Sequence, residues 1–211
     1  MSAARYAHSL ELAGVALARA DPRMARLIAA HGPCTLEPRW RQTPYESLIR
    51  AVMFQQLHGN AARAILARFS ALFPDSAFPT PDNVLSADDA TLRSVGLSRQ
   101  KASYIRAIAA GARDGVVPLR RAEFTRVPDE AIIERLTSIR GVGRWTVEML
   151  LISTLGRLDV LPVDDYGVRC GFDRVARRRE PVKPKELAVI GVRWAPYRSV
   201  AAWYLWRSAE A

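Results

Sequence analysis

The stretch SIRGVGRWTVEMLL, residues 138–151, decides the fold. A helical segment that ends near Ser138 is followed by a tight turn over residues 141–143, and a second helix starts at Arg144. Glycine tolerates positive φ and has no side chain, so such a turn can present bare backbone amides. Amides at a helix N-terminus, together with the helix dipole, favour an anion such as a phosphate. A Gly-x-Gly turn also joins helices for purely structural reasons, so the turn alone leaves both interpretations open.

Helical periodicity continues on both sides of this turn. The segment TPYESLIRAVMFQQL, residues 43–57, opens with Thr43 as a candidate N-cap, Pro44 at the first helical position and Glu46 at the third. Apolar residues then recur at helical spacing, and no stretch alternates apolar and polar residues for long enough to support a sheet. We therefore expect an all-α fold with roughly ten helices.

The composition points to a polyanionic partner. Lys and Arg number 31 against 21 Asp and Glu, which gives a net charge of +10, and the excess is mostly arginine, whose planar fork suits phosphate. No run of about 18 uncharged apolar residues exists. The N-terminal stretch is interrupted by Glu11 and Asp21, where a signal peptide needs an unbroken apolar segment. We expect a soluble intracellular protein that binds nucleic acid and no membrane.

The sequence offers no transition-metal site. Cys34 and Cys170 are the only cysteines, too few for a four-thiolate iron–sulfur cluster. The three histidines, His8, His31 and His58, are scattered and do not follow the ligand spacing of a zinc site. We expect no iron–sulfur cluster and no cofactor in catalysis.

The hairpin and the downstream DVLPVDDYGVR, residues 159–169, resemble the helix-hairpin-helix element and its following aspartate in base-excision DNA glycosylases. The likeness is greatest to the alkylation-repair branch, the DNA-3-methyladenine glycosylase II type. It extends over residues 45–62, 96–109 and 195–206. The resemblance implies a two-lobed helical glycosylase that occupies residues 1–211 as one unit. Its lobe A would span residues 50–160 with the hairpin at 137–151, and its lobe B residues 1–49 and 161–211.

In this family the hairpin binds a DNA phosphate and holds a monovalent cation, Na⁺ or K⁺, with backbone carbonyls. By position these carbonyls belong to Thr137, Ile139 and Val142. Members that also cut the DNA strand carry a lysine two places after the second glycine, where this chain has Trp145. A tryptophan cannot form a Schiff base, so the resemblance implies a monofunctional enzyme in which water is the nucleophile.

Asp164 and Asp165 are the candidate catalytic carboxylates. Either could simply cap the helix that follows. Cleavage of an N-glycosidic bond builds positive charge on the sugar, and a fixed carboxylate can stabilise that charge and orient the water. The family's Pro-x-Asp pattern selects Asp164, which we prefer, whereas counting without gaps from the hairpin tryptophan selects Asp165.

The resemblance also implies a base pocket and a DNA surface. The enzyme must evert the nucleotide, and an aromatic pocket attracts a cationic base. The expected pocket residues are Trp145, Trp206, Tyr45, Phe54 and Met149, the last at a position where relatives often have an aromatic. The turn at Gln56, Leu57 and His58 is expected to fill the gap in the duplex. The remaining expected DNA contacts are Gly141, Val142, Gly143, Arg144, Lys101 and Arg198.

The resemblance therefore implies a monomeric DNA glycosylase that removes alkylated purines of the 3-methyladenine and 7-methylguanine type from double-stranded DNA. The alternatives are a glycosylase for deaminated or oxidised bases and a hairpin DNA-binding protein without catalysis. We expect a cytoplasmic or nucleoid-associated protein in a bacterium, or a nuclear protein in a eukaryote.

Overall fold

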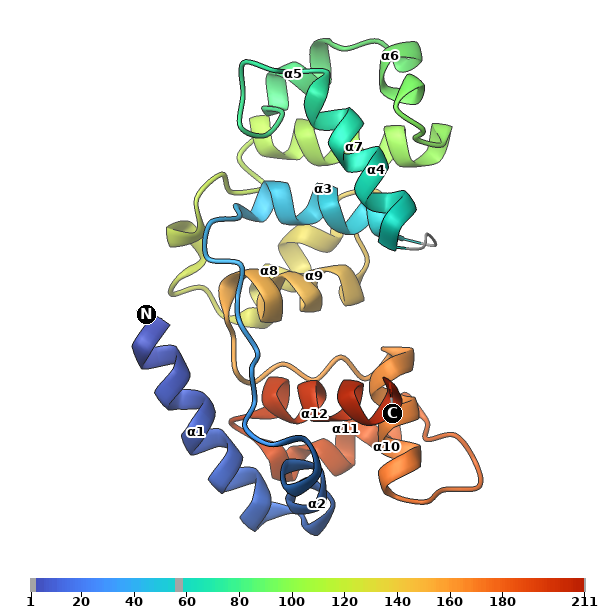
Figure 1. Cartoon of the computed structure of the whole chain (residues 1–211). Helices are drawn as coiled ribbons and strands as arrows, with labels where there is room; N and C mark the ends of the chain where they lie inside the picture. The colour runs from blue at the N-terminus through green and yellow to red at the C-terminus, as the bar shows by residue number, and fades with distance from the viewer. Residues whose placement is uncertain (1–2, 56–58, 211) are drawn as a thin grey trace. The chain divides into compact units, whose positions relative to one another are not determined.

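The computed structural model describes residues 3–55 and 59–210, and within these ranges the chain forms twelve α-helices and no strand (Figure 1). This confirms the all-α prediction. The helices fall into two compact units. One, called here the hairpin unit, comprises residues 39–150; the other, the terminal unit, comprises residues 1–38 and 151–211. The lobe boundaries expected from the resemblance, at residues 50 and 160, lie about ten residues later in the chain.

The hairpin unit is built around the apolar helix α3. Thr43 accepts a hydrogen bond from the Glu46 amide at 3.0 Å, and Pro44 occupies the first turn, so the helix begins where the sequence predicts. Leu48 and Val52 of α3 are fully buried. The helices of the unit are α3 Pro44–Phe54, α4 Gly59–Ala71, α5 Pro81–Ser86, α6 Asp89–Ser94, α7 Arg99–Arg113, α8 Asp129–Thr137 and α9 Arg144–Leu150.

The terminal unit joins the two ends of the chain. Asp21, which is fully buried, accepts hydrogen bonds from Arg23 and from the indole nitrogen of Trp194 at 3.0 Å. Trp194 itself is 1% exposed, as expected for a core tryptophan. The helices of the unit are α1 Ala3–Ala20, α2 Pro22–His31, α10 Tyr166–Val175, α11 Pro184–Gly191 and α12 Arg198–Glu210.

Helices α10 and α12 are in direct backbone contact at Gly171, which has no side chain to separate them. A Cβ atom built at Gly171 of α10 would lie only 1.9 Å from the carbonyl oxygen of Leu205 on α12, so no larger residue fits without moving a helix. This close approach brings the start of α10 next to Trp206. Among the described residues, no helix is long and apolar enough to cross a membrane.

Candidate active site

The turn between α8 and α9 has the backbone that the sequence predicts. Gly141 has a φ of +89°, and a Cβ atom there would lie 2.2 Å from Cγ of Tyr104, so only glycine fits. Val142 is buried, and its amide donates to the carbonyl oxygen of Ile139 at 3.0 Å. A Cβ atom at Gly143 would meet no atom within 4 Å. The first glycine therefore packs against α7, whereas the second faces open space.

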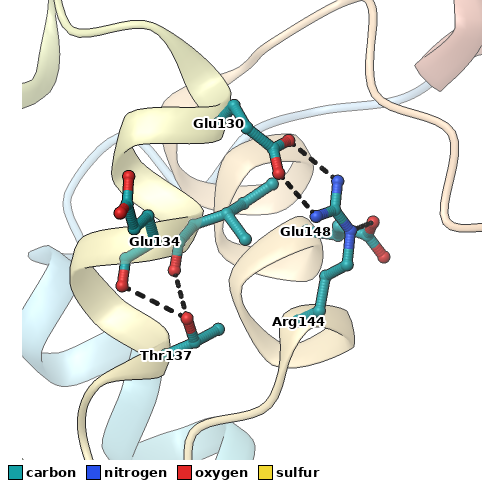
Figure 2. A network of polar contacts seen from close by, with 6 residues as sticks. Glu130, Glu134, Thr137, Arg144 and Glu148 are labelled. Carbon is teal, nitrogen blue, oxygen red and sulfur yellow. Dashed lines mark hydrogen bonds and ion pairs between the residues drawn. The ribbon is translucent and has the colours of Figure 1, made fainter.

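A hollow of about 530 Å³ lies over this turn. All three residues expected to hold a cation with their carbonyls belong to its lining. The Thr137 hydroxyl points back into α8 and donates to the carbonyls of Ile133 and Glu134 at 2.8 and 3.2 Å (Figure 2). The lining residues are Gln55, Tyr104, Thr137, Ser138, Ile139, Arg140, Gly141, Val142 and Gly143.

Arg144 joins the two helices of the hairpin. Its Nη atoms donate to both carboxylate oxygens of Glu130 on α8, at 2.7 and 2.9 Å, and its Nε donates to Glu148 on α9 at 3.1 Å (Figure 2). Glu148 is buried, with 4% of its surface exposed. The hydrogen bonds that Arg144 donates to Glu130 raise the pKa of Arg144 above its ordinary value. Arg144 was predicted to contact DNA, but its guanidinium is already bound to the carboxylates of Glu130 and Glu148.

Two other predicted phosphate contacts also bind protein groups. Lys101 donates to the carbonyls of Met53 and Gln55 at the end of α3, at 2.9 and 2.7 Å, and burial lowers its pKa. Arg198 forms a two-pronged ion pair with Asp159 at 2.8 and 2.9 Å. These partners come from distant parts of the chain, so the local sequence gave no sign of them.

Arg140 was not predicted as a DNA contact. It is exposed, lines the hollow over the hairpin and takes part in none of the ion pairs found among residues 3–55 and 59–210. Its place between Ile139 and Gly141 in the turn was the available sequence signal.

The two aspartates differ in their surroundings. Asp165 is 9% exposed and is the N-cap of α10, where its Oδ1 accepts from the Val168 amide at 2.8 Å. The same Oδ1 accepts from Nε1 of Trp206 at 2.8 Å. Asp164 is exposed, and no hydrogen bond to its carboxylate is found within the described ranges. The structure thus brings Asp165 and Trp206 together and leaves Asp164 in solvent.

The predicted aromatic pocket residues divide between core and surface. Tyr45 is 3% exposed and packs edge-on against Phe78, with ring centroids 6.2 Å apart, so it belongs to the core of the hairpin unit. Trp145 and Phe54 are 40% and 37% exposed. Met149 of the same unit and Trp206 of the terminal unit are partly exposed.

Tyr166, which follows Asp165 in the chain, is 75% exposed and was not predicted as a site residue. Its position directly after the aspartate pair was the available sequence signal. The predicted gap-filling residues Gln56, Leu57 and His58 lie outside the described residues.

Known proteins share this sequence pattern and fold. The family described as "HhH-GPD superfamily base excision DNA repair protein" matches residues 49–196. The chain belongs to this superfamily. An HhH-GPD relative, DNA-3-methyladenine glycosylase 1 of Schizosaccharomyces pombe, is 42% identical over 172 residues, covering 81% of this chain and 74% of the relative.

Solved HhH-GPD structures agree with the fold. The 3-methyladenine DNA glycosylase of Schizosaccharomyces pombe, in complex with abasic DNA, has a TM-score of 0.84 at 38% identity and covers 94% of this chain and 97% of that one. The DNA-3-methyladenine glycosidase of Bacillus halodurans has a TM-score of 0.81 at 34% identity, covering 92% and 87% of the two chains. The family and fold that the sequence predicts are therefore confirmed.

Proposed function

We propose that this chain is a monofunctional DNA glycosylase that hydrolyses the N-glycosidic bond of alkylated purines in double-stranded DNA and leaves an abasic site. The observation that carries the proposal is the buried carboxylate of Asp165, held by Trp206 and by the first turn of α10. The similarity to relatives named DNA-3-methyladenine glycosylase supports the substrate class.

Asp165 is the carboxylate of this mechanism. Two donors meet its Oδ1, so the direction of the carboxylate is set before substrate arrives. As the bond to the base breaks, positive charge develops on the sugar, and a fixed, partly dry carboxylate stabilises it and orients the attacking water. An alkylated purine already carries positive charge and leaves without a general acid. Asp164 lacks these hydrogen bonds, so we propose Asp165 as the catalytic carboxylate instead of Asp164, which the Pro-x-Asp pattern favoured.

The hollow over the hairpin is the proposed site for a DNA phosphate. Gly143 leaves its rim open, and the Arg140 side chain stands there without a carboxylate partner among the described residues. Thr137, Ile139 and Val142 line this hollow, and their carbonyl oxygens, which are hard ligands, would hold a monovalent cation that adds positive charge beside the phosphate. The chain has no lysine at position 145, which favours hydrolysis over strand cleavage.

The base pocket is proposed to use exposed aromatic faces. Trp206 of the terminal unit stands next to Asp165 and is partly exposed. The π-face of an indole attracts a cationic base and tolerates different ring substituents. Tyr45 is not part of the proposed pocket, because it is buried in the core of the hairpin unit.

Release of free methylated bases from alkylated duplex DNA tests the proposal. Asp165→Asn should lower the single-turnover rate by about 10² or more, because an amide cannot stabilise the sugar cation. Asp164→Asn is the matched control and should stay within about twofold of wild type. The opposite ranking would assign the reaction to Asp164. No release by the wild type, with DNA binding retained, would favour a non-catalytic hairpin protein, and release from deaminated or oxidised DNA alone would favour another lesion class.

Gly143→Ala tests the phosphate site. The added methyl group meets no protein atom within 4 Å, so the variant should fold normally, but the methyl group would stand between the turn and a phosphate. DNA affinity should fall about tenfold. Gly14→Ala, which also adds a methyl group in open space but on α1, is the control and should bind DNA like the wild type. Equal affinities for the two variants would remove the hairpin from the DNA surface.

A further inference from the structure

Arg169 stands four residues after Asp165, and its guanidinium makes no hydrogen bond or ion pair with the described part of the chain. Its amide donates to the Asp165 carbonyl at 3.1 Å, as in any α-helix, but its side chain is different. The Nε atom is covered from solvent and has no hydrogen-bond partner. Within residues 3–55 and 59–210 the guanidinium joins no ion pair.

Nearby arginines of the terminal unit bind protein acceptors. Arg174 on the same helix donates to the Ser208 carbonyl at 2.7 Å, Arg178 binds both carboxylate oxygens of Glu186, and Arg198 binds Asp159. Covering part of a guanidinium without an acceptor is unfavourable, since its lost hydration is not replaced. An external acceptor would restore the missing hydrogen bonds.

The position of Arg169 indicates which acceptor. Asp165 is the N-cap of α10, and the Arg169 amide makes the first hydrogen bond of the helix to the Asp165 carbonyl, so the two residues lie at the same end of α10. A hydrogen bond with Cys170 raises the pKa of Tyr166, and the nearby positive charge of Arg169 opposes that rise. Arg169 therefore stands near the N-terminal end of the helix that the proposed catalytic carboxylate caps.

We propose that Arg169 binds the DNA phosphate that flanks the everted nucleotide. The guanidinium fork matches two phosphate oxygens. The phosphates attached to a nucleotide lie close to its sugar, at a distance comparable to one turn of an α-helix, about 5 Å. A phosphate bound to Arg169 also occupies its guanidinium, which could otherwise neutralise the charge of Asp165 four residues earlier. The carboxylate charge then remains available for the sugar. This inference rests on the proposed function, in which Asp165 faces the sugar.

Arg169→Gln tests the contact, with Arg178→Gln as the matched control. Both lose one positive charge, but Arg178 lies beyond the far end of α10, whose 10 residues span about 15 Å. Binding to a duplex with a tetrahydrofuran abasic analogue is measured over a range of salt concentrations. Arg169→Gln should raise Kd about tenfold and make the slope of log K against log salt shallower by about 0.9, the value for one phosphate. Arg178→Gln should leave both quantities near wild type.

Arg169→Lys and the melting temperature separate binding from folding. The lysine keeps the charge but loses the fork, so the salt slope should persist while Kd rises several-fold. If Arg169→Gln and Arg178→Gln show equal slopes and affinities, the inference is overturned. A lower melting temperature of Arg169→Gln with an unchanged slope would also overturn it, in favour of a structural role. A shallower slope in Arg169→Gln, together with no base release by the wild type, would support the phosphate contact and reject the glycosylase proposal.

Discussion

Replacing Arg144 with methionine decides whether this residue braces the hairpin or contacts DNA. The structure ties its guanidinium to Glu130 on one helix and to the buried Glu148 on the other. Methionine keeps an apolar stem of similar reach and removes the charge. We expect the variant to lose stability, because the hairpin loses its link and Glu148 loses this cation.

The two ion pairs contribute unequally to the free energy of unfolding. The side chains of Arg144 and Glu130 are 49% and 72% exposed, so their pair is worth at most about 0.5–1 kcal/mol. The Glu148 side chain is 5% exposed, and breaking a buried pair typically costs about 3–5 kcal/mol. Since Arg144 is half exposed, we expect about 2 kcal/mol from this second pair and about 2–3 kcal/mol in total.

Urea unfolding followed by far-UV circular dichroism measures this loss. Adding Glu148→Gln to Arg144→Met should recover much of it, because the buried charge is then gone. Hydrogen bonds from Arg144 lower the pKa of Glu130 below 4.5, so this exposed pair stabilises the fold above that pH and is lost as pH falls through the lower, folded-state pKa. The gap between wild type and Glu130→Gln should accordingly close in acid. Wild-type stability of Arg144→Met, with a salt slope of DNA binding shallower by about 0.9, would refute the brace and restore the phosphate contact.

Three further substitutions have defined outcomes. Trp206→Phe keeps a ring but removes the N–H that Asp165 accepts, so base release should slow about tenfold with little change in melting temperature; an unchanged rate would show that the bond is not needed. Gly141→Ala forces a side chain into positive φ, 2.2 Å from the Tyr104 ring, and should destabilise the protein by about 2–4 kcal/mol in urea unfolding; near-wild-type stability would contradict the packing. Lys101→Met removes two hydrogen bonds to the last carbonyls of α3 and should cost about 1–3 kcal/mol without altering the salt slope of DNA binding, whereas a shallower slope would make Lys101 a phosphate ligand.

The sequence predicts features that depend on neighbouring residues. The N-cap at Thr43 and the glycine turn at 141–143 follow from local backbone preferences, and the structure confirms both. The hairpin and its downstream aspartates also identified the family, because their combination is specific. Local pattern was sufficient for the fold class and for the elements around the candidate site.

Features that depend on distant partners could not be read in this way. Arg198 looks like a free cation until the fold places Asp159 against it, 39 residues earlier in the chain. Tyr45 looks like a pocket aromatic until Phe78 covers it. The proposal of Asp165 in place of Asp164 rests on which carboxylate accepts from the Val168 amide, and a spacing rule from proline does not contain that information.

The contact at Gly171 bears on any attempt to redesign the enzyme. Because two main chains touch there, the separation of α10 and α12 is set by backbone atoms, which substitutions elsewhere on either helix do not alter. The distance between Asp165 and Trp206 is therefore fixed by the packing of these two helices. Libraries that aim at new lesions can vary the exposed aromatic faces freely, whereas a methyl group at position 171 would collide with Leu205, the neighbour of Trp206, less than two helical turns from Asp165.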